Sequence, residues 1–245
     1  MSLKEVDTRI HEKILDIPDS ALKLQSTFKM LIQGQSGLGK TEFILKLLAS
    51  NKMVDEYHLV VYCIPSNTGH LPSVKNVIER LKNICKNIVI HEGMLLDIES
   101  VFSPVNDEKA LLLYDDLYSE LINSRVFSHL ATFGSRHANC SLIITSQNIF
   151  ESSKYSLTIR RQMQYYVIFY PVNEKSTLIT LGRSLFPENP FCLLNCFKKL
   201  IPNTKSPHEQ YLLIDMNPKS VLPYNLRLRS NFFSDEEPYF FLVDD

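Results

Sequence analysis

One eight-residue motif constrains the fold of this chain more than any other feature of its sequence. Residues 34–41 read GQSGLGKT and match the pattern GxxxxGK[ST]. They lie between an apolar run, Phe28–Gln33, and a stretch whose apolar residues Phe43, Ile44, Leu47 and Leu48 have helical spacing. Glycines let backbone N–H groups approach phosphate oxygens closely, and the start of a helix presents a positive dipole to them. The sequence therefore predicts a phosphate-binding loop between a strand and a helix.

Glycine usage sharpens this prediction. The chain has seven glycines, whereas average usage in 245 residues gives about 17, and three of the seven fall in the loop. Lys40 is expected to place its charge on the β- and γ-phosphates, and the Thr41 hydroxyl to bind Mg²⁺. The residues expected to bind the nucleotide are the whole loop: Gly34, Gln35, Ser36, Gly37, Leu38, Gly39, Lys40 and Thr41.

Short apolar runs alternate with helical periodicity along the rest of the chain, which predicts an α/β protein with a mainly parallel central sheet flanked by helices. The predicted strands are Phe28–Gln33, His58–Ile64, Asn87–His91, Ala110–Asp115, Cys140–Ser146 and Gln164–Tyr170. One helix is expected from Leu117 to Phe133. The predicted divisions are an N-terminal helical extension (1–25, with a helix at Glu5–Leu15), a nucleotide-binding core (26–172) and an appendage (173–245). Short helices and a hairpin of Tyr211–Asp215 with Asn225–Arg229 are expected in the appendage.

Composition excludes several classes of protein. The chain has 26 basic and 27 acidic residues, so it lacks the overall basic charge typical of proteins that coat nucleic acid. Its apolar runs are too short to span a bilayer, and its first residues do not resemble a signal peptide, so neither secretion nor membrane insertion is expected. The five cysteines show no CxxC pair and are expected to be free thiols in a reducing compartment, without a zinc site.

Two carboxylates follow the buried run Leu111–Tyr114. Asp115 is expected to bind Mg²⁺, directly or through water, and Asp116 to accept a proton from the attacking water. Asp116 is also well placed to be the N-cap of the next helix, and the two roles are compatible.

Polar residues also follow the next apolar run, Leu142–Ile144. The Gln147 amide is a candidate for contacting the γ-phosphate or orienting the water, ahead of Asn148 and Thr145, although such residues also form turns. Arg136, in a predicted loop before this strand, is a candidate arginine finger acting on a neighbouring subunit, and Arg160 and Arg161 are rival candidates.

With these motifs in place, the chain resembles viral genome-packaging ATPases of the FtsK/HerA superfamily, in the branch of eukaryotic DNA viruses, virophages and Polinton/Maverick elements. The resemblance covers about residues 26–172 and is most specific at Gly134–Phe150, where an Arg-His pair precedes a strand ending in Gln-Asn. It implies a RecA-like P-loop NTPase fold, in which Gln147 senses the γ-phosphate and Arg136 acts in trans. Two departures are Asp116, where many relatives have Glu, and Gln164, where relatives often have Asn.

The resemblance also implies a function. The expected activity is hydrolysis of ATP with Mg²⁺ to translocate double-stranded DNA into a preformed capsid. The expected partners are DNA, other copies of the chain in a ring (pentamer or hexamer), and a capsid or portal vertex. The expected location is inside the host cell, in the nucleus or a cytoplasmic virus factory, or associated with the virion. The alternatives are a nucleotide-gated switch or scaffold, and a small-molecule or nucleotide kinase.

Overall fold

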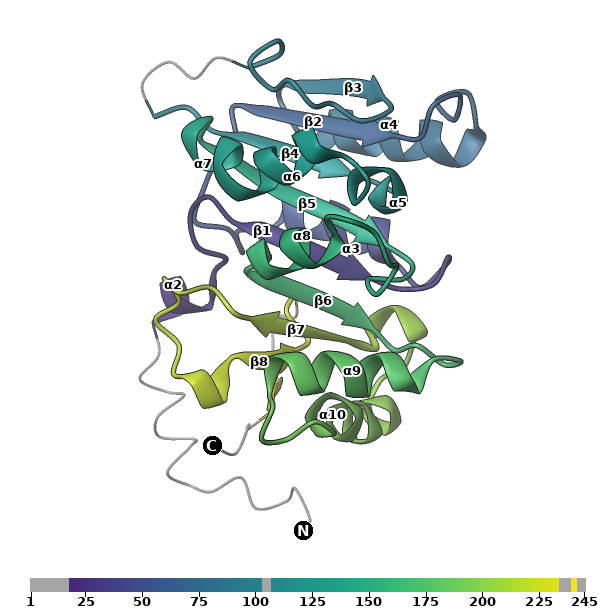
Figure 1. Cartoon of the computed structure of the whole chain (residues 1–245), viewed down its shortest axis with the longest axis vertical. Helices are drawn as coiled ribbons and strands as arrows, with labels where there is room; N and C mark the ends of the chain where they lie inside the picture. Colours follow the sequence, from purple (N-terminus) through teal and green to yellow (C-terminus); the bar gives the residue numbers. More distant parts are fainter. Residues whose placement is uncertain (1–17, 103–106, 234–238, 242–245) are drawn as a thin grey trace.

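A single twisted sheet runs through the molecule (Figure 1). The computed structural model describes residues 18–102, 107–233 and 239–241. Within these residues the sheet has nine strands in the order β3-β2-β4-β5-β1-β6-β7-β8-β9. The six strands from β3 to β6 pair in parallel, and β7, β8 and β9 extend the sheet in antiparallel pairing. The sheet therefore continues from the predicted core into the predicted appendage.

The six predicted parallel strands are confirmed. The strands are β1 (Lys29–Gln33), β2 (Leu59–Ile64), β3 (Ile88–Glu92), β4 (Ala110–Tyr114), β5 (Cys140–Ser146), β6 (Tyr165–Phe169), β7 (Tyr211–Asp215), β8 (Leu228–Ser230) and β9 (Tyr239–Phe241). Strands β4, β5 and β6 are buried along their whole length. Such burial explains why these strands are near-continuous apolar runs without a polar face.

Helices cover both faces of the sheet, as predicted (Figure 1). One face packs against α3 (Lys40–Ala49) and α4 (Pro72–Ile84). The opposite face packs against a larger set of helices: α5 (Tyr118–Leu121), α6 (Arg125–His129), α8 (Ser156–Gln162), α9 (Lys175–Leu185) and α10 (Cys192–Leu200). Shorter elements are α2 (Asp19–Leu22), α7 (Ser135–His137) and the 3₁₀ turns Ile201–Asn203, Pro207–Glu209 and Tyr224–Leu226. None of the described helices is long and apolar enough to cross a membrane.

The prediction of one helix from Leu117 to Phe133 is wrong. The structure divides this stretch into α5 and α6, because Ser124 takes an extended conformation and its side chain accepts a hydrogen bond from the Phe127 N–H (3.1 Å). Helix α6 then passes through a π-helical turn, Leu130–Gly134, directly into α7. Arg136 therefore lies on a short helix and not in the predicted loop.

The predicted hairpin in the appendage is confirmed as the antiparallel pair β7–β8, in which Leu213 is opposite Arg229. The short helices expected there are α9 and α10. The helix predicted at Glu5–Leu15 lies outside the described residues.

Parallel pairing brings three strand ends to one edge of the sheet, called here the carboxyl edge. In β1, Gln33 is opposite Ser146 of β5, and in β4, Tyr114 is opposite Ile144 of β5. The residues that follow these strands, including Gly34 and Asp115, must then share this edge. The opposite, amino edge carries the residues that precede the strands.

Candidate active site

The phosphate-binding loop leaves β1 in a conformation that needs its glycines. Gly37 and Gly39 have φ values of 82° and 105°, in the left-handed region that glycine adopts without strain. Gly34 donates its N–H to the Ser146 carbonyl (3.0 Å), and a Cβ at Gly34 would lie 3.0 Å from Cβ of Phe169. Gly39 is the N-cap of α3, so the loop delivers the chain into the helix as predicted. The loop and the start of α3 form a cradle for an anion.

Lys40 points back into this loop. Its side chain is buried, and Nζ donates hydrogen bonds to the carbonyl oxygens of Gly34 (2.8 Å) and Gln35 (3.4 Å). These bonds fix the ammonium group within the curve of the loop. A cation held there faces any phosphate that the loop's N–H groups bind.

The Asp115 carboxylate accepts hydrogen bonds from three hydroxyl groups at the carboxyl edge. Thr145 Oγ1 donates to Oδ1 (2.7 Å), while Tyr62 OH (2.8 Å) and Thr41 Oγ1 (3.4 Å) donate to Oδ2. Burial, followed by the charge of Asp115, raises the pKa of Tyr62, which therefore keeps its proton and remains a donor. Two strands, β2 and β5, and the start of α3 thus orient this one carboxylate.

Sequence reasoning missed two of these contacts. Tyr62 looked like another apolar strand residue, and Thr145 was considered only as a phosphate contact, behind Gln147. Each of the two strands beside β4 has a hydroxyl side chain near its carboxyl end, and this is the signal in the sequence. Its meaning depends on the strand order, which the sequence alone does not give.

The oxygen donors present fit Mg²⁺. A carboxylate and a hydroxyl, at Asp115 and Thr41, lie within 3.4 Å of each other beside the phosphate-binding loop. Mg²⁺ in nucleotide sites takes one or two such protein oxygens and completes its octahedral shell with phosphates and water. Asp115 and Thr41 are therefore the residues that would hold the ion.

Asp116 takes a left-handed conformation, with φ of 53°, and its N–H donates to Thr145 Oγ1 (2.8 Å). Burial and then the neighbouring Asp115 raise its pKa, whereas Lys40 and a hydrogen bond from Gln147 act in the opposite direction. Asp116, Gln147 and Lys40 are therefore close enough to interact. The alternative role of Asp116 as an N-cap is wrong, since Leu117 occupies that position.

The two amides after β5 differ in their surroundings. Gln147 is exposed and interacts with Asp116, in agreement with its predicted place at the carboxyl edge. Asn148 instead closes a turn, because its Oδ1 accepts a hydrogen bond from the Phe150 N–H (2.9 Å). Gln147 is thus the amide free to meet a bound phosphate or water.

Arg136 lies far from this group. It is exposed, precedes β5 at the amino edge, and lies near Lys29, whose pKa is lowered by burial and then by the Arg136 charge. The seven residues of β5 put the two edges about 20 Å apart. Of the rivals, Arg160 stacks on the Phe150 ring (4.7 Å to its centroid), and Arg161 is exposed. Both also precede their strand, β6, at the amino edge.

A loop of this shape after β1, with two acids after β4 on the far side of β5, defines a P-loop nucleoside triphosphatase. The family model for the poxvirus A32 protein matches residues 19–190, and the chain belongs to this family. Membership confirms the resemblance to viral genome-packaging ATPases found in the sequence. Comparison with curated protein sequences gives no match.

A solved structure shares the fold. The crystal structure of B204, the DNA-packaging ATPase from Sulfolobus turreted icosahedral virus, is 14% identical over 79% of this chain and 94% of that chain, with a TM-score of 0.50. The genome-packaging NTPase B204 from Sulfolobus turreted icosahedral virus 2, in complex with ATP-gammaS, is 11% identical over 78% and 93% of the two chains, with a TM-score of 0.48. At these identities the likeness concerns the fold alone.

Proposed function

We propose that this protein is an ATP-hydrolysing motor that drives a double-stranded DNA genome into a preformed viral capsid. The observation that carries the proposal is the meeting of Lys40, Thr41, Asp115 and Asp116 at one edge of a parallel sheet. Family membership and the shared fold with a viral DNA-packaging ATPase support the DNA-packaging part.

Each residue has a distinct task in hydrolysis. The loop's N–H groups and Lys40 bind the β- and γ-phosphates. Thr41 and Asp115 would hold Mg²⁺, which would supply positive charge beside those phosphates. Asp116 accepts a proton from the water that attacks the γ-phosphorus, and Gln147 orients that water. The bond from the γ-phosphorus to the bridging oxygen breaks, giving ADP and inorganic phosphate. The role of Gln147 is supported by its hydrogen bond to Asp116, which puts the amide beside the proposed base.

Arg136 acts on the nucleotide of a neighbouring subunit. Its place at the amino edge, about 20 Å from its own phosphate-binding loop, prevents it from reaching its own nucleotide. Head-to-tail contacts that repeat around a closed ring bring the amino edge of one subunit to the carboxyl edge of the next. The assembly is then a ring, a pentamer or hexamer, in which each finger stabilises charge at the neighbour's γ-phosphate.

DNA and a capsid or portal vertex are the other partners, and the motor works inside the infected cell, in the nucleus or a cytoplasmic virus factory. The net charge of −1 limits how strongly one subunit grips DNA. Binding is therefore shared, with a few contacts per subunit multiplied around the ring.

The test is ATP hydrolysis per subunit, measured across a protein-concentration series with and without double-stranded DNA. A motor that assembles through Arg136 gives a rate per subunit that rises with concentration and rises further with DNA. A rate that stays flat and ignores DNA contradicts the ring motor. Phosphate transfer to a small acceptor indicates a kinase, and binding with negligible turnover indicates a switch.

A further inference from the structure

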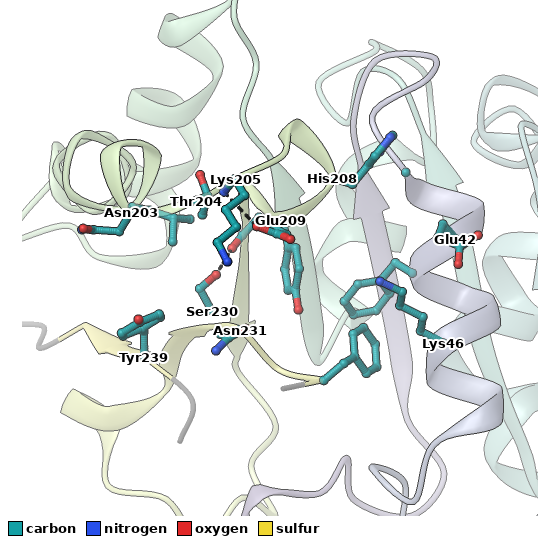
Figure 2. Close-up of a pocket in the computed structure, with 15 residues that line it drawn as sticks. Glu42, Lys46, Asn203, Thr204, Lys205, His208, Glu209, Ser230, Asn231 and Tyr239 are labelled. Carbon is teal, nitrogen blue, oxygen red and sulfur yellow. Dashed lines mark hydrogen bonds between the residues drawn. The ribbon is translucent and has the colours of Figure 1, made fainter. Parts of the chain in front are cut away.

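A pocket of about 450 Å³ opens beside the phosphate-binding loop, and it shares only Gly39 with the site described above. Glu42 and Lys46 of α3 reach it from one side, and Thr204 and Lys205, which follow α10, from the other (Figure 2). Asn231 and Tyr239, in the lower part of this view, complete the lining. Most of its wall thus comes from residues 200–211, 230–233 and Tyr239, called here the C-terminal segment, for which the sequence offered no functional motif.

The pocket begins where the phosphate site ends. Gly39, the last glycine of the loop, lines it, and the lining continues along α3 through Phe43 to Lys46. The seven residues from Lys40 to Lys46 span about 10 Å of helix. His208 packs against Gly39, where the loop meets the pocket, so closely that a Cβ at Gly39 would lie 2.8 Å from Nδ1 of His208. A molecule whose phosphates occupy the loop can therefore extend along α3 into this half-open pocket.

The lining suits a flat, partly polar molecule. Phe43 forms an aromatic wall with Tyr211 and Phe233, at ring-centroid distances of 5.2 and 4.8 Å. Polar groups at Thr204 and Asn231 line the same space and can bind ring nitrogens or hydroxyls. The lining thus combines an aromatic wall with many polar groups, and its volume lies within the range of sites for small organic ligands.

The two carboxylates that line the pocket already accept hydrogen bonds from other groups of the protein. Glu42 makes a bidentate ion pair with Arg80 (2.7 and 3.0 Å), and Glu209 accepts a hydrogen bond from the Lys205 N–H (3.0 Å). Both contacts hold these carboxylates on partners within the protein.

We propose that this pocket binds the nucleoside, a purine base with its ribose, of the nucleotide whose phosphates lie on the loop. The proposal rests on the proposed function. It makes this C-terminal segment part of the nucleotide site, with Thr204 and His208 as binding residues. The nucleoside then bridges α3 and the antiparallel end of the sheet.

The test compares two ligands with Mg²⁺ by calorimetry: a non-hydrolysable ATP analogue, and inorganic tripolyphosphate, which lacks the nucleoside. Thr204→Phe fills the pocket, and His208→Ala removes an exposed side chain at its junction with the loop. Both variants are expected to weaken binding of the analogue about tenfold to a hundredfold and to leave tripolyphosphate binding unchanged. Thr180→Phe, on the exposed face of α9, is the matched control and leaves both affinities unchanged.

Two results would overturn the pocket proposal: equal affinity of the wild-type protein for the two ligands, or an unchanged affinity ratio in both Thr204→Phe and His208→Ala. Failure of the proposed function looks different. In that case Lys40→Ala leaves the binding of both ligands as strong as in the wild-type protein. The analogue-to-tripolyphosphate ratio tests the pocket, whereas the Lys40 variant tests the loop.

Discussion

Thr145 connects the two acids of the site through one hydroxyl group. Its Oγ1 donates to Asp115 Oδ1 (2.7 Å) and accepts from the Asp116 N–H (2.8 Å). A hydroxyl has one hydrogen and two lone pairs, so a single orientation satisfies both bonds. The end of β5 thereby sets the position of the carboxylate proposed to hold Mg²⁺ and of the backbone that carries the proposed base.

Thr145→Val keeps the shape of this side chain and removes both bonds. We expect a 10- to 100-fold loss in apparent Mg²⁺ affinity or in ATP hydrolysis, the usual effect of removing a group that orients a metal ligand. Thr145→Ser retains the hydroxyl and is the control. A Mg²⁺ titration of hydrolysis measures the effect, and equal curves for the Val and Ser variants would contradict the orienting role.

Tyr62→Phe removes one of the three donors to Asp115 and keeps the buried ring. Since Thr145 and Thr41 still hold the carboxylate, we expect a smaller rise in the Mg²⁺ concentration needed for half-maximal activity than in Thr145→Val. The thermal unfolding midpoint of the variant serves as the control for folding. A larger loss than in Thr145→Val would mean that Tyr62 has another role at the site.

The parts of this site that are local in sequence could be predicted from sequence. The strand, glycines, Lys40 and Thr41 are consecutive, and Asp115 directly follows a run of buried residues, so each signal lies within one short segment. The contact between Tyr62 and Asp115 spans 53 residues and depends on β2 lying next to β4, which no local pattern specifies.

The break between α5 and α6 escaped prediction for a related reason. Helical spacing continues across Asn123 and Ser124, and only the capping bond from the Phe127 N–H to Ser124 shows that the helix restarts. Likewise, nothing near His208 in sequence indicates that it lies against Gly39. Packing of the C-terminal segment on the loop determines that contact.

Asp116→Asn tests the proposed base. The variant cannot accept the proton of the attacking water, so we expect kcat to fall about 10²- to 10⁴-fold. ATP affinity is expected to persist, because Lys40 and the loop remain intact. Asp116→Glu keeps a carboxylate and is expected to retain measurable hydrolysis. Full activity in the Asn variant, measured by phosphate release, would remove Asp116 from the mechanism.

The raised pKa of Asp116 has consequences for pH dependence. A base works only when deprotonated, so hydrolysis should rise with pH through a value above 3.8, the ordinary aspartate pKa. The same shift also affects the free energy of unfolding. Between 3.8 and the raised pKa, the folded chain holds this proton more tightly than the unfolded chain, so the free energy of unfolding falls as pH increases. We therefore expect Asp116→Asn to unfold at a higher temperature than wild type at pH 7. The difference between the two unfolding temperatures should vanish below pH 3.8, where Asp116 is protonated in both states. If Asp116→Asn is equally stabilised at that pH, the effect has another cause.

Arg136→Ala tests the trans-acting finger. Removing the guanidinium should cut hydrolysis about 10³- to 10⁵-fold, the range found where such fingers operate. Nucleotide affinity should persist, since Arg136 lies at the amino edge, away from its own loop. Arg161→Ala, a change at the exposed rival before β6, is measured beside it and is expected to keep its activity. A loss in Arg161→Ala, with none in Arg136→Ala, would transfer the role to Arg161.

Mixing two inactive variants separates a finger in trans from a local structural effect. Lys40→Ala subunits keep Arg136, and Arg136→Ala subunits keep a working loop. In a ring formed from an equal mixture, about a quarter of the contacts pair a working loop with a working finger. Hydrolysis should therefore return to a clear fraction of the wild-type rate when the variants are mixed before assembly. Mixtures that stay as inactive as their components would show that Arg136 does not act across subunits.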